Sequence, residues 1–433
     1  MKHQLSDPRK TTATLSNGLR VVVIELPHLH TGSAQLMVRV GSRYEDGPAA
    51  GLSHFVEHMI YRGSVQYPTT FELNCAIERR GGGLYAETSR EITSYLLDAP
   101  PESLPGLLDV LGDALINPGW HQLDVEKKIV LEEILEDLDE DGQLVRSDDV
   151  ARRQAWGDHP LGQPITGTRD SVAAFTEAAI AAHHRDAYVG ANSVLCVAGP
   201  FEPEPILEAA ERAFAALHPG RRLEPQPAPQ HFSAPGLRFI RYPESQTTLN
   251  LVMHALSEPH PLSAAQSLLL RILDDGLSTR LYRRIVDELG LAYNVGASAE
   301  VLEDVVLVDI SASCAHNSAV RLTDEVLTIG RTLAREPPSP DELEIAKRRM
   351  LWDVEASFDN PRAMVEYYGT VELLRREQTM LERAEQILAA TRDELHEAAR
   401  ALFVPDRLAL AAVGKLPKGD LAALASLLKL GVA

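Results

Sequence analysis

Hydrophobic positions in the first half of the chain follow two spacings, one typical of strands and one typical of helices. Residues 20–25 are rich in β-branched side chains and follow an Asn-Gly pair, which predicts a strand after a tight turn. A second strand is predicted at 34–46, where an apolar run ends in a glycine turn. The other elements predicted in this half are helices at 69–80, 101–115, 124–140 and 204–216, and strands at 87–100 and within 184–202.

The second half repeats this order of elements. Five prolines and no apolar periodicity mark residues 218–236 as a linker. The run 407–416 resembles 192–201, because each is a late apolar strand that leads into a glycine. We therefore predict an α+β fold of two similar domains, 1–217 and 237–433, each with a mixed sheet flanked by helices. The elements predicted after the linker are strands at 237–242, 247–256 and 291–314, and helices at 261–275, 279–289, 318–334, 339–358, 361–375 and 379–402.

Composition narrows the choice of partners. The chain has 42 Lys and Arg against 62 Asp and Glu residues, a net charge of −20, which argues against nucleic acid as a partner. The acidic charge either keeps the surface soluble or lines an interior wall that favours cationic peptides. There is no run of 18 apolar residues and no apolar signal region at the N-terminus, so we expect no membrane partner and a cytoplasmic location. Three scattered cysteines without a CxxC spacing fit a reducing compartment.

The stretch GLSHFVEHMIYRGS, residues 51–64, places two histidines and a glutamate within five positions. His54 and His58 are four residues apart, so a helix presents both on one face, where two neutral imidazoles can share a zinc ion. Glu57 leans over the same face, and HxxEH is the inverted zinc-protease motif. The pattern alone leaves open a helix with two unrelated histidines, because the chain contains 15 of them.

A catalytic zinc ion needs a third protein ligand. In the helix predicted at 124–140, Glu126, Glu133 and Asp137 fall on one face. Seven residues are close to two helical turns, so Glu126 and Glu133 can point toward the same site. The same pattern also fits a solvated acidic face of a helix, and spacing alone does not decide between the two.

Five blocks of the sequence occur in an order that points to one family. They are GSRYEDGPAAGLSHFVEHMIYRGS (41–64), FELNCAIERRGGGLYAETSREITSY (71–95), VEKKIVLEEI (125–134), HPLGQPITGT (159–168) and LSTRLYRRIVDELGLAYNV (277–295). Together they resemble the M16 peptidases, the pitrilysin and insulinase group, and in particular the half-size M16B branch of that family.

The resemblance implies a role for each acidic and imidazole group. His54, His58 and Glu133 would bind one Zn²⁺ per chain, and Glu126 would orient a ligand through a hydrogen bond. Glu57 would be the general base, which takes a proton from the attacking water and passes it to the leaving amine. The neighbouring Glu132 lies about 100° round the helix from Glu133, so the seven-residue interval favours Glu133.

The resemblance also implies that the edge strand after the glycine turn binds the substrate backbone by strand addition. The substrate-binding residues would be Gly82, Gly83, Tyr85 and Ala86. The family usually has Asn-Ala where this chain has Tyr85-Ala86. Tyrosine still donates one hydrogen bond but is bulkier, so either the subsite is reshaped or the substitution is tolerated.

A second departure concerns the C-terminal half, where active members supply an arginine and a tyrosine seven residues apart. Tyr293 fills the tyrosine position, but Val286 stands where the arginine belongs. Loss of one oxyanion-type donor commonly costs about 10²–10³ in rate. On an α-helix Arg284 would point about 160° away from Val286 and Arg283 about 60°, so only Arg283 could compensate in part. We therefore predict a heterodimer with a homologous M16B subunit that supplies the arginine–tyrosine pair, and a homodimer as the second choice.

The predicted function is a zinc-dependent endopeptidase. Its substrates would be unstructured peptides, such as a leader or an oligopeptide pool, cleaved in a chamber that paired subunits enclose like a clamshell. The alternative is a non-catalytic scaffold, because relatives with this fold serve as core subunits of a respiratory complex. The motifs of those relatives are typically eroded, whereas the five acidic and imidazole residues named above are all in place here.

Overall fold

The computed structural model describes residues 6–430, which form two compact units. Each unit is assembled from three separate segments of the chain. The first comprises the residues up to Ile134, Pro164–Gln226 and Asp353–Arg383, and the second comprises Leu135–Gln163, Pro227–Trp352 and the residues from Ala384 onward. One passage between the units, from Gln226 to Pro227, falls inside the stretch 218–236 that the sequence marks as a linker.

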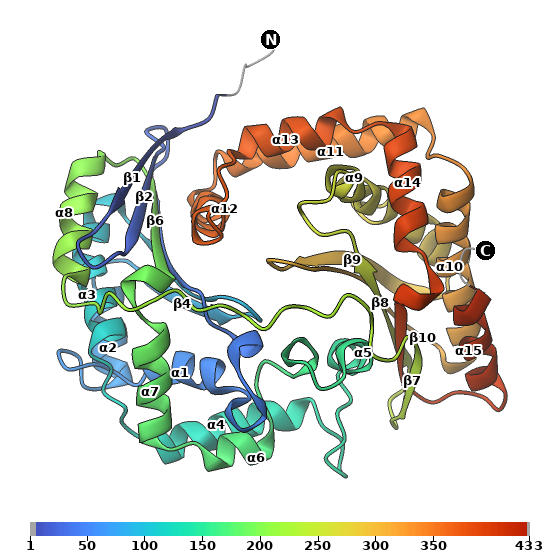
Figure 1. Ribbon diagram of the computed structural model, residues 1–433, viewed down its shortest axis with the longest axis horizontal. Helices are drawn as coiled ribbons and strands as arrows, with labels where there is room; N and C mark the ends of the chain where they lie inside the picture. Colours follow the sequence, from blue (N-terminus) through green and yellow to red (C-terminus); the bar gives the residue numbers. More distant parts are fainter. Residues whose placement is uncertain (1–5, 431–433) are drawn as a thin grey trace. The chain divides into compact units, whose positions relative to one another are not determined.

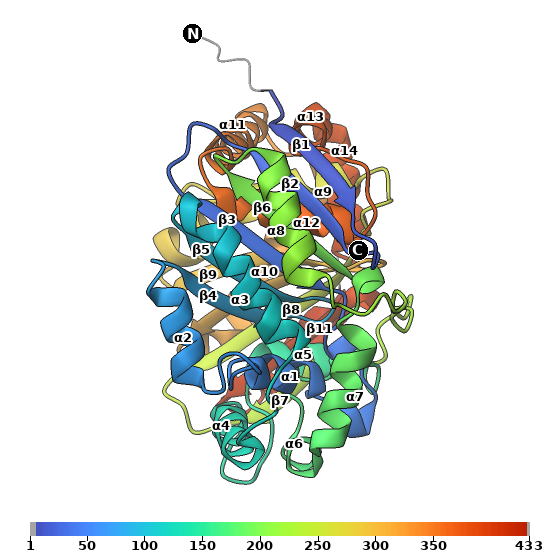
Figure 2. The same ribbon diagram turned by 90° about the vertical axis from the view of Figure 1, so that its left-hand side faces the viewer.

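A six-stranded mixed sheet is the framework of the first unit. Its strands are Arg9–Thr14 (β1), Arg20–Glu25 (β2), Gly32–Val38 (β3), Gly83–Thr88 (β4), Thr93–Ala99 (β5) and Ser193–Gly199 (β6). The helices of this unit are Leu52–Ile60 (α1), Thr70–Glu78 (α2), Leu104–Ile116 (α3), Leu123–Glu136 (α4), Arg169–Ala174 (α6), Glu177–Ala187 (α7), Pro203–Phe214 (α8) and Pro361–Leu373 (α12). The strand order is β1-β2-β6-β3-β5-β4, so β4 lies at an edge. Helices α3 and α8 cover one face of the sheet, as Figure 2 shows, and α12 covers the other (Figure 1).

The second unit contains a five-stranded sheet in the order β7-β11-β8-β10-β9. These strands are Gly236–Arg241 (β7), Thr247–Ala255 (β8), Ala292–Val301 (β9), Val306–Cys314 (β10) and Leu408–Gly414 (β11). Its helices include Ser147–Trp156 (α5), Ser263–Leu273 (α9), Ala319–Arg335 (α10), Arg392–Leu402 (α14) and Asp420–Leu430 (α15). Two further helices, Pro340–Ser357 (α11) and Met380–Ala389 (α13), span points at which the chain passes between units.

The two sheets share one topology, which confirms the prediction of two similar α+β halves. β6 lies between a parallel neighbour, β2, and an antiparallel neighbour, β3. β11 lies in the same way between β7 and β8. All seven residues of β6 and all seven of β11 are buried, because helices cover both faces of each sheet and such strands must be apolar throughout. The similarity between 192–201 and 407–416 therefore reflects equivalent places in the two sheets.

The halves exchange one helix, which the division into 1–217 and 237–433 did not foresee. Helix α12, from the C-terminal half of the chain, packs on β6 and β3 of the first unit. Gly369 allows this close approach, since a Cβ there would lie 2.9 Å from the Met37 sulfur. Helix α5, from the N-terminal half, packs on β11 and β8 with Ala151 and Ala155 buried. Each exchanged helix covers a sheet face that a contiguous domain would leave exposed to water.

Several local elements also differ from the sequence prediction. The helix expected at 279–289 is a π-helical segment at Tyr282–Glu288. The helix expected at 379–402 is divided into α13 and α14, because Thr391 and Glu394 form a capping box that begins a new helix. The elements that the sequence did not predict are β1, α5, α6, α7 and α15.

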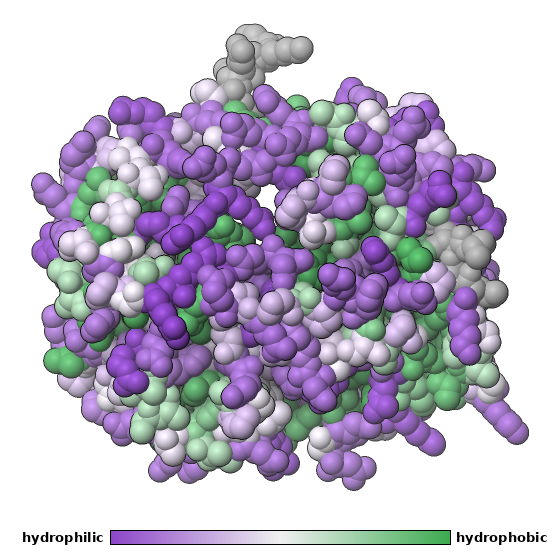
Figure 3. Space-filling view, viewed as in Figure 1, coloured by the Kyte–Doolittle hydropathy of each residue, from purple (hydrophilic) through white to green (hydrophobic). Residues whose placement is uncertain are grey.

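The surface agrees with the acidic, polar composition. The face shown in Figure 3 is covered mainly by hydrophilic residues, and hydrophobic residues occur on it in small separate groups. Within residues 6–430, no helix combines the length and the apolar character that a membrane crossing requires.

Candidate metal centre

The HxxEH motif, the candidate for metal binding, lies on α1, whose start is fixed by a buried carboxylate. Glu45 accepts hydrogen bonds from the backbone N–H groups of Gly51 (2.7 Å) and Ser53 (2.6 Å). Gly51 has φ +87°, and a Cβ there would lie 2.5 Å from the Thr166 carbonyl oxygen, so only glycine fits. Burial raises the pKa of Glu45 to about 7, although the hydrogen bonds from Ser53 and Gly51 lower it.

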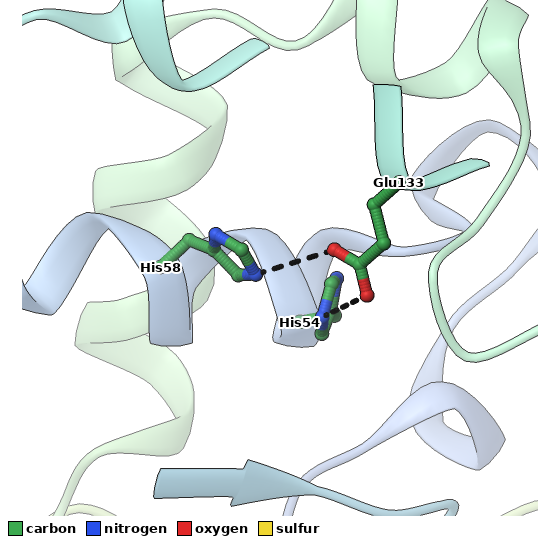
Figure 4. A group of neighbouring side chains, drawn as sticks. All are labelled: His54, His58 and Glu133. Carbon is green, nitrogen blue, oxygen red and sulfur yellow. Dashed lines mark ion pairs between the residues drawn. The ribbon is translucent and has the colours of Figure 1, made fainter. Parts of the chain in front are cut away.

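The structure brings together the three residues that the sequence predicts as ligands. His54 and His58 project from the same face of α1, and Glu133 reaches them from α4 (Figure 4). The Nε2 atom of His54 lies 3.6 Å from one carboxylate oxygen of Glu133, and the Nε2 atom of His58 lies 3.5 Å from the other. Donor atoms of all three residues lie within 4.8 Å of one another.

These distances fit a tetrahedral zinc ion. Zinc bonds of about 2.1 Å to nitrogen and oxygen place adjacent donors about 3.4 Å apart in a tetrahedron. The observed separations of 3.5 and 3.6 Å, one to each oxygen of the Glu133 carboxylate, are near that value, and one donor atom of each residue lies within 4.8 Å of the other two. Two imidazoles and one carboxylate are also a donor set that catalytic zinc sites use, with one position left for water or substrate.

Glu126 sets the orientation of His58. The Nδ1–H group of His58 donates to Glu126 Oε1 over 2.8 Å, which leaves the Nε2 lone pair directed toward Glu133. Arg62 holds the other oxygen of Glu126 in an ion pair. Burial alone would raise the pKa of Glu126, but hydrogen bonds from His58 and Arg62 outweigh it and lower the pKa.

His54 is held in the neutral form that a metal ligand needs. Its exposed fraction is 9%, and burial, together with the neighbouring charge of His58, lowers its pKa to about 3. Its Nδ1 atom is buried without a hydrogen-bond partner among the described residues. At neutral pH the imidazole is uncharged and can offer a lone pair to a metal, and Nε2 is the nitrogen that faces Glu133.

Glu57 lies beside the ligands and is tied to the edge strand. Thr88, the last residue of β4, donates a hydrogen bond of 2.6 Å to Glu57 Oε2. Burial raises the pKa of Glu57, and the bond from Thr88 opposes that shift. A pocket of about 360 Å³ opens beside this carboxylate and is also lined by His58, Tyr61 and Arg62. Glu57 is thus placed where a base could meet a bound peptide.

Sequence reasoning missed three residues that support this centre: Glu45, Arg62 and Thr88. A signal for Arg62 was present, because it follows His58 by four residues, the spacing of one helix face, although α1 ends at Ile60 and Arg62 lies in the turn that follows. Thr88 could have been found from the alternation of side chains along a strand that begins at Gly83. Glu45 had no comparable signal, since it lies in a loop before α1 and acts through its side chain on backbone groups.

The residues predicted to bind substrate lie at the start of β4. Gly82 precedes the strand, and Gly83, Tyr85 and Ala86 belong to it. Among the strands of residues 6–430, β4 pairs with β5 alone, so its other edge can accept an additional strand. The Tyr85 side chain is exposed, and the guanidinium carbon of Arg362 lies 4.8 Å from the centre of its ring.

The predicted tyrosine and its missing arginine lie in the second unit. Tyr293, at the start of β9, is 95% exposed. Val286 lies in the π-helical segment and packs against the hydrophobic core of its unit. Arg283 and Arg284 both form ion pairs with Glu288, and Arg284 also pairs with Glu325. The angles estimated for an α-helix do not apply to this π-helical segment. Arg283, which we expected to compensate in part for the missing arginine, already forms an ion pair with Glu288.

Comparison with known proteins shows which family the chain belongs to. Residues 20–169 match the family model described as insulinase (peptidase family M16), and residues 174–350 match the model described as the peptidase M16 inactive domain. An uncharacterized zinc protease of Rickettsia felis is 30% identical over 317 residues, 72% of this chain and 76% of the relative. The chain belongs to the M16 peptidase family.

Other M16 relatives cover more of the chain. An uncharacterized zinc protease of Mycobacterium tuberculosis is 29% identical over 406 residues, which is 92% of this chain and 91% of the relative. Solved structures agree in fold. A protease from Helicobacter pylori, 19% identical, has a TM-score of 0.85 over 95% of this chain and 100% of its own. A chain of complex III from Candida albicans, 17% identical, has a TM-score of 0.78 over 96% of this chain and 99% of its own.

Proposed function

We propose that this M16 chain is a zinc-dependent endopeptidase that cleaves unstructured peptides and holds one Zn²⁺ per chain. The observation that supports it most is the meeting of two imidazole nitrogens with one carboxylate at 3.5 and 3.6 Å. His54, His58 and Glu133 would hold the metal. Bound there, zinc would supply Lewis acidity to the scissile carbonyl.

The chain's own residues would then carry the proton. Glu57 would accept a proton from the attacking water as the new C–O bond forms, and would deliver it to the leaving nitrogen as the C–N bond breaks. The Thr88 hydroxyl holds Glu57 Oε2, so Oε1 is the oxygen left to accept the proton. His58 would keep its ligand orientation because Glu126 accepts from its other nitrogen.

β4 would bind the substrate backbone. An extended peptide laid along its outer edge forms main-chain hydrogen bonds that do not depend on sequence. Thr88 joins this strand to Glu57, so a peptide on β4 would run past the general base. This mode demands an unfolded substrate, and it fits a leader peptide or an oligopeptide.

The proposal extends to a heterodimer with a homologous M16B subunit that brings the arginine–tyrosine pair, in a chamber that the two subunits enclose. Its support is Val286, which has neither charge nor hydrogen-bonding groups, and the pairing of Arg283 and Arg284 with acidic residues of this chain. A homodimer is the second choice. A cytoplasmic location remains part of the proposal.

Zinc content and peptide cleavage test the function together. The purified chain, alone and with a homologous M16 subunit that carries the arginine–tyrosine pair, is assayed with quenched fluorescent peptides, with Glu57→Gln as the control. Zinc with Glu57-dependent cleavage supports the peptidase. Absence of both zinc and cleavage in every combination would favour the non-catalytic scaffold instead.

A further inference from the structure

A pocket of about 410 Å³ lies on the face of the β4 edge that points away from the metal centre. Side chains alternate along a strand, so Tyr85 and Glu87 point to the opposite face from Thr88, which contacts α1. Tyr85 lies opposite Leu96 in the register with β5, and Glu87 lies opposite Ser94. All four line the pocket, and α12 contributes Arg362, Glu366 and Thr370.

The lining divides into an apolar floor and a polar wall. Met37, Ile92 and Leu96 supply apolar side chains. Gln35 lines the pocket from β3 with an exposed fraction of 8%, and its Oε1 has no hydrogen-bond partner in the part of the chain that the structure describes. A buried amide without a partner is costly, and a hydrogen-bonding group that enters the pocket would remove that cost.

The charges at the rim favour a cation. Within residues 6–430, Glu87 and Glu366 form no ion pair, and both are exposed at the pocket. The one cationic side chain in the lining, Arg362, is already engaged, because it forms an ion pair with Asp98 and its guanidinium lies over the Tyr85 ring. A carboxylate entering the pocket would meet two unpaired acids, whereas an ammonium or guanidinium group would pair with them.

We propose that this pocket binds the side chain of a lysine or arginine in a peptide that lies along β4. The long apolar stem of such a side chain would pack on Met37 and Leu96, while its charged end would reach Glu87, Glu366 and the Gln35 amide. Successive side chains of an added strand alternate between the two faces. The basic residue is therefore required at one fixed distance from the cleaved bond, on the face opposite Glu57.

This inference rests on the proposed function, and it gives a role to Tyr85, the residue that departs from the family pattern. An asparagine at this position has no ring on which Arg362 could stack. Tyr85 and Asp98 together hold Arg362 to one side of the pocket, where its charge is neutralised. Tyr85 thus acts as a positioning residue for the wall of a basic subsite.

Peptide binding tests the pocket separately from catalysis. The Glu57→Gln protein, with its partner subunit if one is required, is titrated with fluorescent peptides that differ at one residue: arginine, citrulline or glutamate. Citrulline keeps the shape of arginine without its charge. We expect arginine to bind about tenfold more tightly than citrulline at low salt, a preference that falls as ionic strength rises, and glutamate to bind least.

Substitutions in the pocket test whether its acidic residues cause the preference for arginine over citrulline. Glu87→Gln and Glu366→Gln should each reduce the arginine preference about threefold, while Glu102→Gln, an equal change of charge at an exposed site outside the pocket, should leave it unchanged. Equal binding of arginine and citrulline peptides, tighter binding of glutamate, no binding of any peptide, or an equal effect of all three variants would overturn the pocket. If the wild type cleaves peptides without preferring a basic residue, the proposed role of the pocket is wrong and the peptidase function stands. If peptides with a basic residue bind more tightly but the wild type cleaves none, the proposed peptidase function is wrong and the binding role of the pocket stands.

Discussion

The two units have the same sheet topology, but they differ in what they place beside the edge strand. Strands β2-β6-β3-β5-β4 correspond in order and direction to β7-β11-β8-β10-β9. In the first unit the helix after β3 is α1, LSHFVEHMI. In the second unit the helix after β8, the strand equivalent to β3, is α9, SAAQSLLLRIL, which contains no histidine, cysteine or carboxylate. The shared strand order therefore does not determine the candidate chemistry, which depends on a few side chains of α1 and α4.

The contacts that hold the N-terminal parts of α1 and α9 also differ between the two units. Glu45 fixes the start of α1 through the N–H groups of Gly51 and Ser53. In the second unit Gln266, a residue of α9 itself, exchanges hydrogen bonds with the backbone N–H and C=O of Leu256. A neutral amide suffices where only structure is needed. The first unit instead buries a carboxylate next to the helix that carries the HxxEH motif, and the raised pKa of that carboxylate leads to a pH dependence of stability.

Replacement of the general base should have the largest effect. Glu57→Gln removes the proton acceptor and keeps the side-chain shape, so the rate of peptide cleavage should fall about 10²–10⁴-fold with zinc content unchanged. Ser267→Ala, a conservative change on α9 of the other unit, should not alter the rate. Undiminished cleavage by Glu57→Gln would place the chemistry elsewhere.

Gly51→Ala should break the start of α1. The new Cβ would meet the Thr166 carbonyl at a backbone angle that disfavours alanine, at a cost of about 3 kcal/mol of unfolding free energy. Gly142→Ala is the control, because Gly142 also has a positive φ, +78°, but a Cβ there meets nothing within 4 Å. Urea denaturation of the two variants measures the difference. Equal losses would mean that close packing at Gly51 is unimportant.

The raised pKa of Glu45 predicts that the stability of the protein depends on pH. Its folded-state pKa, about 7, is raised above the unfolded value of 4.5, so the folded protein binds the extra proton between these values. Stability should therefore fall as pH rises from 4.5 to 7, on the order of 2 kcal/mol from this group. Glu45→Gln should flatten that part of the pH profile of the metal-free protein, and Glu102→Gln should not. A profile that stays as steep in Glu45→Gln would contradict the account.

Glu126→Gln should have a smaller effect, on the metal alone. An amide in place of the carboxylate binds His58 less strongly, which should weaken zinc affinity about 10–100-fold. Glu132→Gln, a neutral replacement on the same helix, should change affinity little. Competition with a zinc-binding dye measures both, and equal affinities for the two variants would remove Glu126 from the centre.

The sequence predicted local elements better than long-range ones. β2 was predicted at 20–25 with its observed bounds, because a β-branched run after a turn is a local signal. The set His54, His58 and Glu133 followed from helical spacing and from the family resemblance. The exchange of α5 and α12 left no such signal, since each helix packs on strands far away in sequence. The polar sequence SDDVARRQAW gives no sign of a buried helix. In the structure it forms α5, which packs on β11 and β8 with Ala151 and Ala155 buried.

Zinc stoichiometry of the purified chain tests the central claim most directly. The account predicts one zinc per chain in the wild type, none in Glu133→Gln after dialysis against a weak chelator, and one in Glu132→Gln. A wild-type chain that binds no zinc, or a Glu133→Gln chain that keeps it, would contradict the assignment of the metal centre to α1 and α4 of the first unit.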